Sequence, residues 1–134
     1  MPKLTDAQAS FLHDEAHYAV IAALREDGSV HQTVIWIDWD AERELLLLNL
    51  NNFRAKLDYL EQDPRVSVLV IANDSAYRWI GLEGKVAEIT TEGAYEHIVR
   101  QAKLYLGRDG YELGEGEERV LVKVALERVE AHGV

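Results

Sequence analysis

The sequence predicts an antiparallel β-barrel with helices at its periphery. Apolar segments of strand length follow one another, most of the turns between them are of hairpin length, and helical spacing is confined to a few segments. A chain of 134 residues has the usual size of one compact domain. We therefore treat residues 1–134 as a single domain and expect one site.

Caps and breakers bound the first two predicted helices. Thr5 and Gln8 have the form of a capping box at the start of the first helix. Asn51 or Asn52 can cap the second, which ends ahead of Pro64 because proline disfavours helical geometry at the residue before it. In residue ranges, the predicted elements are a helix 5–16, strands 18–24, 30–39 and 44–49, a helix from 51 or 52 to 60, strands 66–71 and 77–89, a helix from 90 or 91 to 106, and a strand 119–130.

Turn residues and glycines justify the other elements. A tight turn makes the first two strands antiparallel neighbours. Gly81 and Gly84 interrupt the long fifth strand and suggest bulges or bends. Thr90 or Thr91 can cap the last helix and Gly107 can end it, after which a glycine-rich acidic loop leads to a final strand with alternating valines.

The charge balance is strongly acidic, since 14 basic and 24 acidic residues give a formal net charge of −10. This charge repels phosphate backbones and anionic lipids, so neither a nucleic-acid partner nor a membrane partner is expected. The apolar runs are far shorter than the roughly 20 residues that cross a bilayer, and no signal-peptide pattern begins the chain, which favours a cytoplasmic location. The absence of cysteine excludes thiol nucleophiles and cysteine-based zinc sites.

The common catalytic motifs are also missing. The sequence contains no GxGxxG, no GxxxxGK[ST] and no GxSxG. His13 and His17 have the i, i+4 spacing of a zinc motif, but Asp14 stands where zinc proteases carry glutamate, and the predicted helix ends near Ala16. We therefore predict no metal site.

Two cations at a strand-to-helix junction are more informative. Arg54 and Lys56 lie where the second predicted helix begins, and a helix start offers unpaired backbone N–H groups. A guanidinium can bind two phosphate oxygens while a nearby ammonium adds a compact charge. The segment is a candidate phosphate site, although residue statistics alone favour two ordinary exposed helix residues.

Several short motifs occur in an order that resembles a known group. They are His17-Tyr-Ala-Val-Ile-Ala-Ala-Leu24, Asp27-Gly-Ser29, Val34-Ile-Trp36, Arg54-Ala-Lys56, Asp63-Pro-Arg-Val-Ser67, Tyr77-Arg-Trp79 and Gly84-Lys-Val86. The ordered set resembles the pyridoxamine-phosphate-oxidase-like FMN-binding split-barrel superfamily, and in particular its F420-dependent (deazaflavin) oxidoreductase branch. The segments 102–107 and 117–120 resemble the closing section of that branch.

The resemblance implies a six-stranded antiparallel split β-barrel that forms a homodimer, with cofactor sites in the grooves between subunits. It implies that Arg54 and Lys56 contact the cofactor phosphate. Arg78 and Trp79 are expected near the same groove, and Lys103 is a further candidate contact. Packing is the alternative for Trp36 and Trp79, and a structural ion pair is the alternative for Arg78. The positions that the resemblance places around the ring system are Val34, Ile35, Trp36, Leu48, Asn49 and Leu50.

The activity that the resemblance implies is hydride transfer from reduced coenzyme F420 to a small electron-poor organic substrate. An FMN-binding oxidoreductase and a non-catalytic flavin or deazaflavin carrier or sensor are the alternatives. Thr33 and Phe53 depart from the family pattern, which often has proline and a small residue there, so they bear on cofactor identity. Tyr77, Tyr105 and His17 are conceivable proton donors, but no catalytic residue is assigned.

Overall fold

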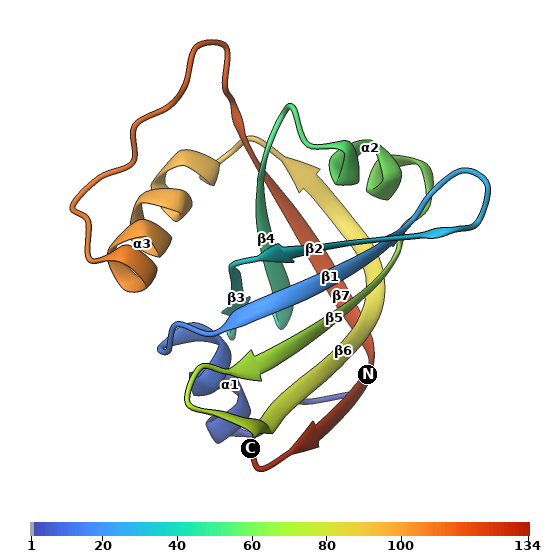
Figure 1. Ribbon diagram of the computed structural model, residues 1–134, viewed down its shortest axis with the longest axis vertical. Coiled ribbons are helices and arrows are strands. Elements are labelled where there is room, and N and C mark those ends of the chain that lie inside the picture. The colour runs from blue at the N-terminus through green and yellow to red at the C-terminus, as the bar shows by residue number, and fades with distance from the viewer. Residues whose placement is uncertain (1) are drawn as a thin grey trace.

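The computed structural model describes residues 2–134, and antiparallel strands dominate it (Figure 1). No helix in this part of the chain has both the length and the apolar character to cross a membrane. The helices are α1 (Asp6–His13), α2 (Ala55–Gln62) and α3 (Ala94–Leu106). The strands are β1 (Tyr18–Leu24), β2 (Val30–Ile35), β3 (Ile37–Asp40), β4 (Leu45–Asn51), β5 (Arg65–Ala72), β6 (Ser75–Thr90) and β7 (Arg119–His132).

The seven strands form one curled sheet in the order β2-β1-β5-β6-β7-β4-β3, with every neighbouring pair antiparallel. The sheet wraps around an apolar core, while α1, α2 and α3 lie at its periphery (Figure 1). Strand alternation builds this core, because every second side chain of β1 and of β5 points inward. The predicted split barrel with peripheral helices is confirmed.

The prediction of six strands is wrong by one, because the segment 30–39 is two strands. Ile35 pairs with Ala19 of β1, whereas Ile37 pairs with Leu48 of β4. The chain therefore changes partners at Trp36, crossing from one edge of the sheet to the other. The indole of Trp36 stacks on Tyr105 of α3, with ring centroids 4.9 Å apart. This one-residue crossing brings the two sheet edges together.

The first helix begins as predicted, and the second does not. Thr5 and Gln8 form the complete capping box of α1, which ends at His13, three residues earlier than expected. The N-cap of α2 is Arg54, with no side-chain cap bond, rather than either asparagine. Asn51 accepts a hydrogen bond from the amide of Phe53 in the preceding turn. Asn52 instead pairs with the loop before β7, donating to Gly116 O and accepting from Glu118 N.

Glycines bound α3 on both sides. Gly93, with φ of 75°, is its N-cap in place of the predicted threonine, and Gly107, with φ of 70°, ends the helix as predicted. Thr90 is instead the last residue of β6. The predicted bulge at Gly84 is confirmed by a register shift beside it, whereas the ladder is regular at Gly81.

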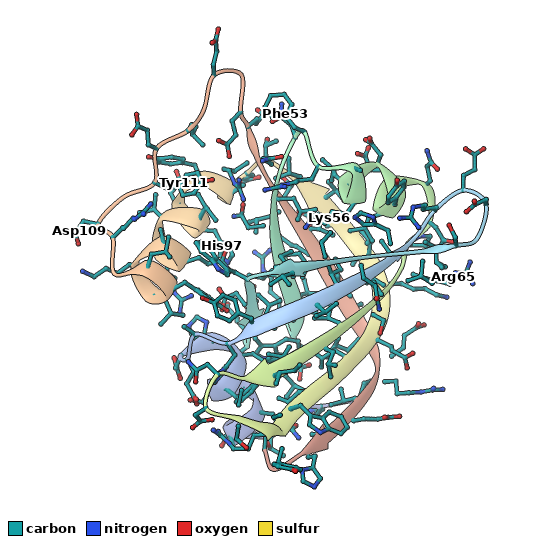
Figure 2. The ribbon with its side chains drawn as sticks, viewed as in Figure 1. Phe53, Lys56, Arg65, His97, Asp109 and Tyr111 are labelled. Carbon is teal, nitrogen blue, oxygen red and sulfur yellow. The ribbon has the colours of Figure 1, made fainter. Side chains whose placement is uncertain are left out.

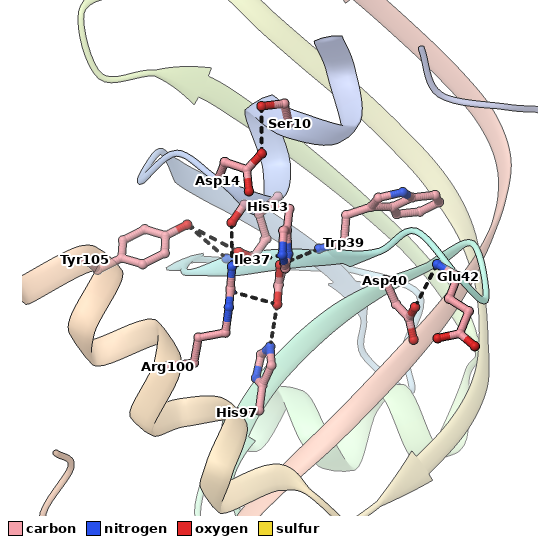
Figure 3. A network of polar contacts seen from close by, with 11 residues as sticks. Ser10, His13, Asp14, Ile37, Trp39, Asp40, Glu42, His97, Arg100 and Tyr105 are labelled. Atoms are coloured by element: carbon pink, nitrogen blue, oxygen red, sulfur yellow. Dashed lines mark hydrogen bonds and ion pairs between the residues drawn. The ribbon is translucent and has the colours of Figure 1, made fainter. Parts of the chain in front are cut away.

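A buried carboxylate attaches α3 and α1 to the sheet, and its partners His13, His97 and Arg100 are labelled in Figure 3. Asp38 of β3 is 3% exposed. One of its oxygens accepts from His13 Nδ1 at 2.7 Å and from the amide of Trp39, while the other accepts from His97 Nε2 at 2.9 Å and from Arg100 at 3.2 Å. Burial acts to raise the pKa of Asp38, but the bonds from His97 and His13 and the charge of Arg100 outweigh it and lower that pKa.

The hydrogen bonds continue from His97 toward β7. Arg119 Nε donates to Asn49 Oδ1 at 2.9 Å, and because arginine can only donate, this bond fixes the orientation of the Asn49 amide. The Asn49 nitrogen then donates to Ala94 O and to His97 Nδ1, both at 2.9 Å. This assigns the proton of His97 to Nε2, which donates it to Asp38. One polar chain therefore links β7, β4, α3, β3 and α1.

We predict that Asp38→Asn lowers the free energy of unfolding by roughly 2–3 kcal/mol at pH 7, because an amide cannot accept from all of these donors. The folded pKa of Asp38 lies below the unfolded value of about 3.9. The stabilisation by the ionised carboxylate is therefore fully present above the unfolded pKa and is lost as the pH falls through the pKa of Asp38 in the folded protein. Denaturant unfolding of both proteins at pH 7 and pH 3 measures this.

Asp74→Asn is the control, because Asp74 is an exposed carboxylate whose ion-pair partner within residues 2–134 is Arg78. We expect it to change stability little at either pH. A destabilisation by Asp38→Asn of the same size at pH 7 and pH 3 would contradict the role given to the ionised carboxylate.

Candidate functional site

A cavity of about 220 Å³ lies where β2, β4, α2, α3 and β7 meet. Figure 2 labels Lys56 of α2, His97 of α3 and Tyr111 of the following loop in this part of the molecule. The cavity brings together most of the residues predicted to bind a cofactor. Those that border it are Val34, Ile35, Trp36, Asn49, Leu50, Arg54 and Lys56.

One end of the cavity is cationic. Lys56 is only 7% exposed, and its ammonium donates to Thr33 Oγ1 at 2.7 Å. Within residues 2–134, neither Arg54 nor Lys56 forms an ion pair with a carboxylate. Burial, and then the charge of Arg54, lower the pKa of Lys56. Two positive charges without a counter-ion make this end suited to an anion.

The start of α2 adds to this preference. Arg54 is the N-cap residue, and its side chain makes no cap bond to the first turn of the helix. The first backbone N–H groups of a helix lack acceptors within the helix and carry partial positive charge. Amide donors, a guanidinium and an ammonium are therefore gathered in one short segment, which is a donor set suited to phosphate.

A third cation beside the cavity is neutralised. Arg119 donates to Glu117 at 2.7 Å, and the same nitrogen lies 3.3 Å from the hydroxyl of Tyr111. The Gly114 amide, followed by Arg119 and Tyr111, lowers the pKa of Glu117, so its carboxylate balances the guanidinium. Arg119 and Tyr111 therefore form a polar wall, while the uncompensated charge stays at Arg54 and Lys56.

Another part of the cavity lining is apolar and partly aromatic. Val34, Leu50 and Ile98 border it together with Trp36. The indole of Trp36 is held from behind by its stack on Tyr105, whose hydroxyl donates to His17 O at 2.9 Å. Burial raises the pKa of this phenol. A fixed aromatic surface next to an anion site suits a flat ligand with a charged tail.

Gln101 is a site residue that sequence reasoning missed. It borders the cavity from α3 and is 1% exposed. In the described chain, its Nε2 and Oε1 are the buried side-chain atoms without any hydrogen-bond partner. Its position in the apolar stripe of α3, with Ala94 and Ile98, was the signal in the sequence, because a polar residue there must be buried.

The other residues predicted to contact the cofactor do not border this cavity in a single copy of the chain. Leu48 is 0% exposed and belongs to the core. Arg78 pairs with Asp74, as its structural alternative proposed, and Trp79 stacks with His132. Lys103 pairs with Asp109. Their cofactor contacts remain predictions.

The suggested proton donors also lie elsewhere. Tyr77 is 79% exposed, Tyr105 is engaged behind Trp36, and His17 is buried between Glu15 and the amide of Asn73. None of the three borders the cavity, whereas Tyr18 and Tyr111 do. Among residues 2–134, no three metal-ligating side chains form a group that could hold a metal ion.

Solved structures share this fold. A protein described as an F420 reductase is 22% identical, with a TM-score of 0.76 over 97% of this chain and 98% of the other. The HupZ protein of Group A Streptococcus is 19% identical, with a TM-score of 0.68 over 96% and 94%. A conserved hypothetical protein from Mycobacterium tuberculosis is 22% identical, with a TM-score of 0.69 over 97% and 85%.

Sequence comparison gives the family. No curated protein matches the sequence. The family model described as pyridoxamine 5'-phosphate oxidase matches residues 4–133, which is nearly the whole chain. The split barrel agrees with this match. The chain therefore belongs to the pyridoxamine 5'-phosphate oxidase family.

Proposed function

We propose that the protein is an oxidoreductase that binds coenzyme F420 and delivers a hydride from the reduced deazaflavin to a small electron-poor organic substrate. The observation that carries this proposal is the pair of uncompensated cations beside an aromatic surface, in a chain whose net charge is −10. The resemblance between the sequence and the F420-dependent branch gives the first choice of cofactor, and the fold shared with an F420 reductase is compatible with it.

The donor set fits a cofactor with a phosphate and a flat ring. Arg54 and Lys56 would hold the phosphate, since neither pairs with a carboxylate of residues 2–134. Thr33 would keep the Lys56 ammonium at the cavity through its 2.7 Å bond. Val34 and Trp36 would pack against the ring. When bound, reduced F420 supplies the hydride, so the chain needs no redox group of its own.

The chain's own residues would bind, orient and exclude water. Anchoring of the anionic end by Arg54 and Lys56 fixes the distance of the ring from the cavity wall. The stack of Tyr105 behind Trp36 prevents the indole from turning away. Ile98 and Leu50 keep the inner wall apolar, which limits water beside the reacting ring. Tyr18 and Tyr111 border the cavity, so they would be the hydroxyls available to a substrate there, in place of the donors expected from the sequence.

The proposed active form is a homodimer with cofactor sites at the subunit interface. Apolar side chains cover the outer face of β1, β2 and β5, where Tyr18 is 55%, Val34 64%, Leu69 41% and Ile71 38% exposed. Tyr18 pairs with Ile71, and Val20 pairs with both Val34 and Leu69, so the five share one face. Tyr18 and Val34 also border the cavity, so a second copy on this face would cover its mouth.

Two alternatives remain open to test. The same cations and aromatic surface suit FMN, because both cofactors carry a phosphate and a planar ring system. A carrier or sensor would bind either cofactor without turnover. Phe53 is 65% exposed beside the anion end, where it would limit the room for a longer tail and so bears on the choice between the two.

We expect F420 to bind more tightly than FMN, and the protein to oxidise reduced F420 in the presence of quinones, nitroaromatics or unsaturated ketones, which accept the hydride. Tryptophan quenching follows binding, because Trp36 borders the cavity. Tighter binding of FMN would favour the FMN alternative. Binding without consumption of the reduced cofactor would indicate a carrier or sensor, and binding of neither would reject the proposed function.

Lys56→Ala is expected to weaken cofactor binding by about 1.5–3 kcal/mol, because it removes a charged hydrogen bond in a sheltered site. Lys85→Ala is the matched control, since Lys85 is exposed and its ammonium forms a long ion pair, 3.7 Å from a carboxylate oxygen of Glu127. The pKa of Lys56 is lowered, so wild-type affinity should fall with rising pH at values below the ordinary lysine pKa of 10.5. Equal dissociation constants for Lys56→Ala and wild type would remove Lys56 from the site.

Leu69→Glu is expected to convert the dimer to a monomer, because it buries a charge in the proposed interface. Sedimentation velocity measures the mass of the particle. Leu113→Glu is the matched control, with 40% exposure in the loop before β7 against 41% for Leu69. A wild-type protein that is already monomeric at micromolar concentration would refute the homodimer.

A further inference from the structure

A second group of nitrogen donors lies between the β1–β2 turn and α2 (Figure 1). The guanidinium of Arg25 lies over the ring of Tyr59, 5.9 Å from its centroid. The imidazole of His31 meets the same ring edge-on, with centroids 5.3 Å apart, and its Nδ1 is 3.3 Å from Arg25 Nη2. None of these three residues borders the cavity. Arg25, His31 and Tyr59 therefore form a separate cluster, which we call the Arg25 cluster.

The Arg25 cluster has donors that the protein does not use. Arginine can only donate, so His31 Nδ1 accepts from Arg25 and the proton of a neutral ring is on Nε2. Within residues 2–134, this Nε2 has no hydrogen-bond partner. Arg25 also donates to Ser29 Oγ at 3.3 Å and to Val30 O at 2.9 Å, which does not use all the N–H groups of its guanidinium. An anion beside the two side chains can accept from both.

The charge of Arg25 is not neutralised by an ion pair. In the described part of the chain, no carboxylate lies within ion-pair distance of its guanidinium. The hydrogen bonds from Ser29, and less strongly the charge of Arg25, lower the pKa of the Asp27 carboxyl in the turn. That carboxylate is held by the hydroxyl of Ser29 at 2.6 Å. The guanidinium therefore remains available to a carboxylate or phosphate of a ligand.

The Arg25 cluster continues the line of cations that begins in the cavity. Lys56 of α2 donates to Thr33 of β2. Three residues further along α2, Tyr59 packs on His31, which precedes Thr33 by two residues in β2. Side chains two residues apart in a strand share a face, and side chains three residues apart in a helix are neighbours. These are therefore successive contacts along one gap between α2 and β2, and two strand residues separate them by about 7 Å.

We propose that Arg25 and His31 form a second anion subsite, which binds a carboxylate on the tail of the cofactor beyond its phosphate. This inference rests on the proposed function, because Arg54 and Lys56 must hold that phosphate. F420 has carboxylates in the tail beyond its phosphate, whereas FMN ends at its phosphate. The subsite would therefore give F420 a charged hydrogen bond that FMN cannot form, and so select between the two cofactors.

The direction of this tail agrees with the surroundings of the phosphate site. From Lys56 to Tyr59 the line runs along α2, away from Phe53, the exposed aromatic residue that precedes this helix. A second phosphate joined directly to the first, as in FAD, would reach less far than the strand spacing of about 7 Å. The spacing therefore favours a carboxylate tail over a diphosphate.

Arg25→Gln tests the proposal, because it removes the charge of the guanidinium and keeps much of the side-chain length. We expect F420 to bind this variant roughly fivefold more weakly than wild type. FMN and a deazaflavin 5'-phosphate without the tail should bind as they do to wild type, since neither reaches the subsite. An equal loss for all three ligands would indicate a structural effect and would contradict the subsite.

Arg43→Gln is the matched control, because it changes the net charge equally. Arg43 is exposed in the β3–β4 turn and forms no ion pair within residues 2–134. The affinities of this variant for all three ligands should equal those of wild type. A loss of F420 affinity as large as that of Arg25→Gln would show that net charge, and not a subsite, sets the affinity.

A second measurement compares ligands on wild type alone. F420 should bind roughly fivefold more tightly than the tail-less deazaflavin phosphate, and the difference should shrink as the salt concentration rises. Equal binding of these two ligands, or an unchanged difference between them in Arg25→Gln, would overturn the proposal while the proposed function stands.

FAD distinguishes the two possible sources of the second anion. If FAD binds wild type more tightly than FMN and this difference is lost in Arg25→Gln, the subsite takes a second phosphate and the assignment to a carboxylate tail is wrong. Equal binding of FAD and FMN is the expected result. Failure of wild type to bind either F420 or FMN would reject the proposed function itself, and with it this inference.

Discussion

The buried carboxylate of Asp38 is the constraint on which the position of the cavity depends. It accepts hydrogen bonds from His13 of α1 and from His97 and Arg100 of α3, so one side chain of β3 holds two helices. The cavity lies partly under α3, which contributes Ile98 and Gln101 to its wall. A loss of the attachment at Asp38 would therefore change the shape of the cavity without any change in its own residues.

The same polar chain decides where free positive charge is found. Arg119 orients the Asn49 amide by donating to its side-chain oxygen, and the Asn49 nitrogen then donates to His97, while Glu117 balances the guanidinium. Arg119 can thus form a wall without adding an uncompensated charge. Among the charged residues that border the cavity, all of them in the described part of the chain, Arg54 and Lys56 at the start of α2 are therefore the cations without an ion pair. A local site of this kind is compatible with a net charge that repels polyanions overall.

Local sequence signals predicted the fold wherever one stretch of chain contained the whole cause. The capping box of α1 and the glycine end of α3 are of this kind. The break at Trp36 could not be predicted, because the apolar run 34–37 continues through it and the break results from a change of strand partner and the stack on Tyr105. The start of α2 was missed for a similar reason, since Asn52 bonds to a loop far along the chain.

The residues of the candidate site show the same difference between local causes and causes that arise only from folding. Arg54 and Lys56 could be found from sequence because two cations and a helix start are adjacent, whereas Gln101 and Arg119 join the cavity only through folding. Gln101 also contradicts the pattern of its own helix, since an amide occupies a position that packing alone would give to an apolar residue. Local rules that fail at a buried position next to a cavity indicate a demand other than stability.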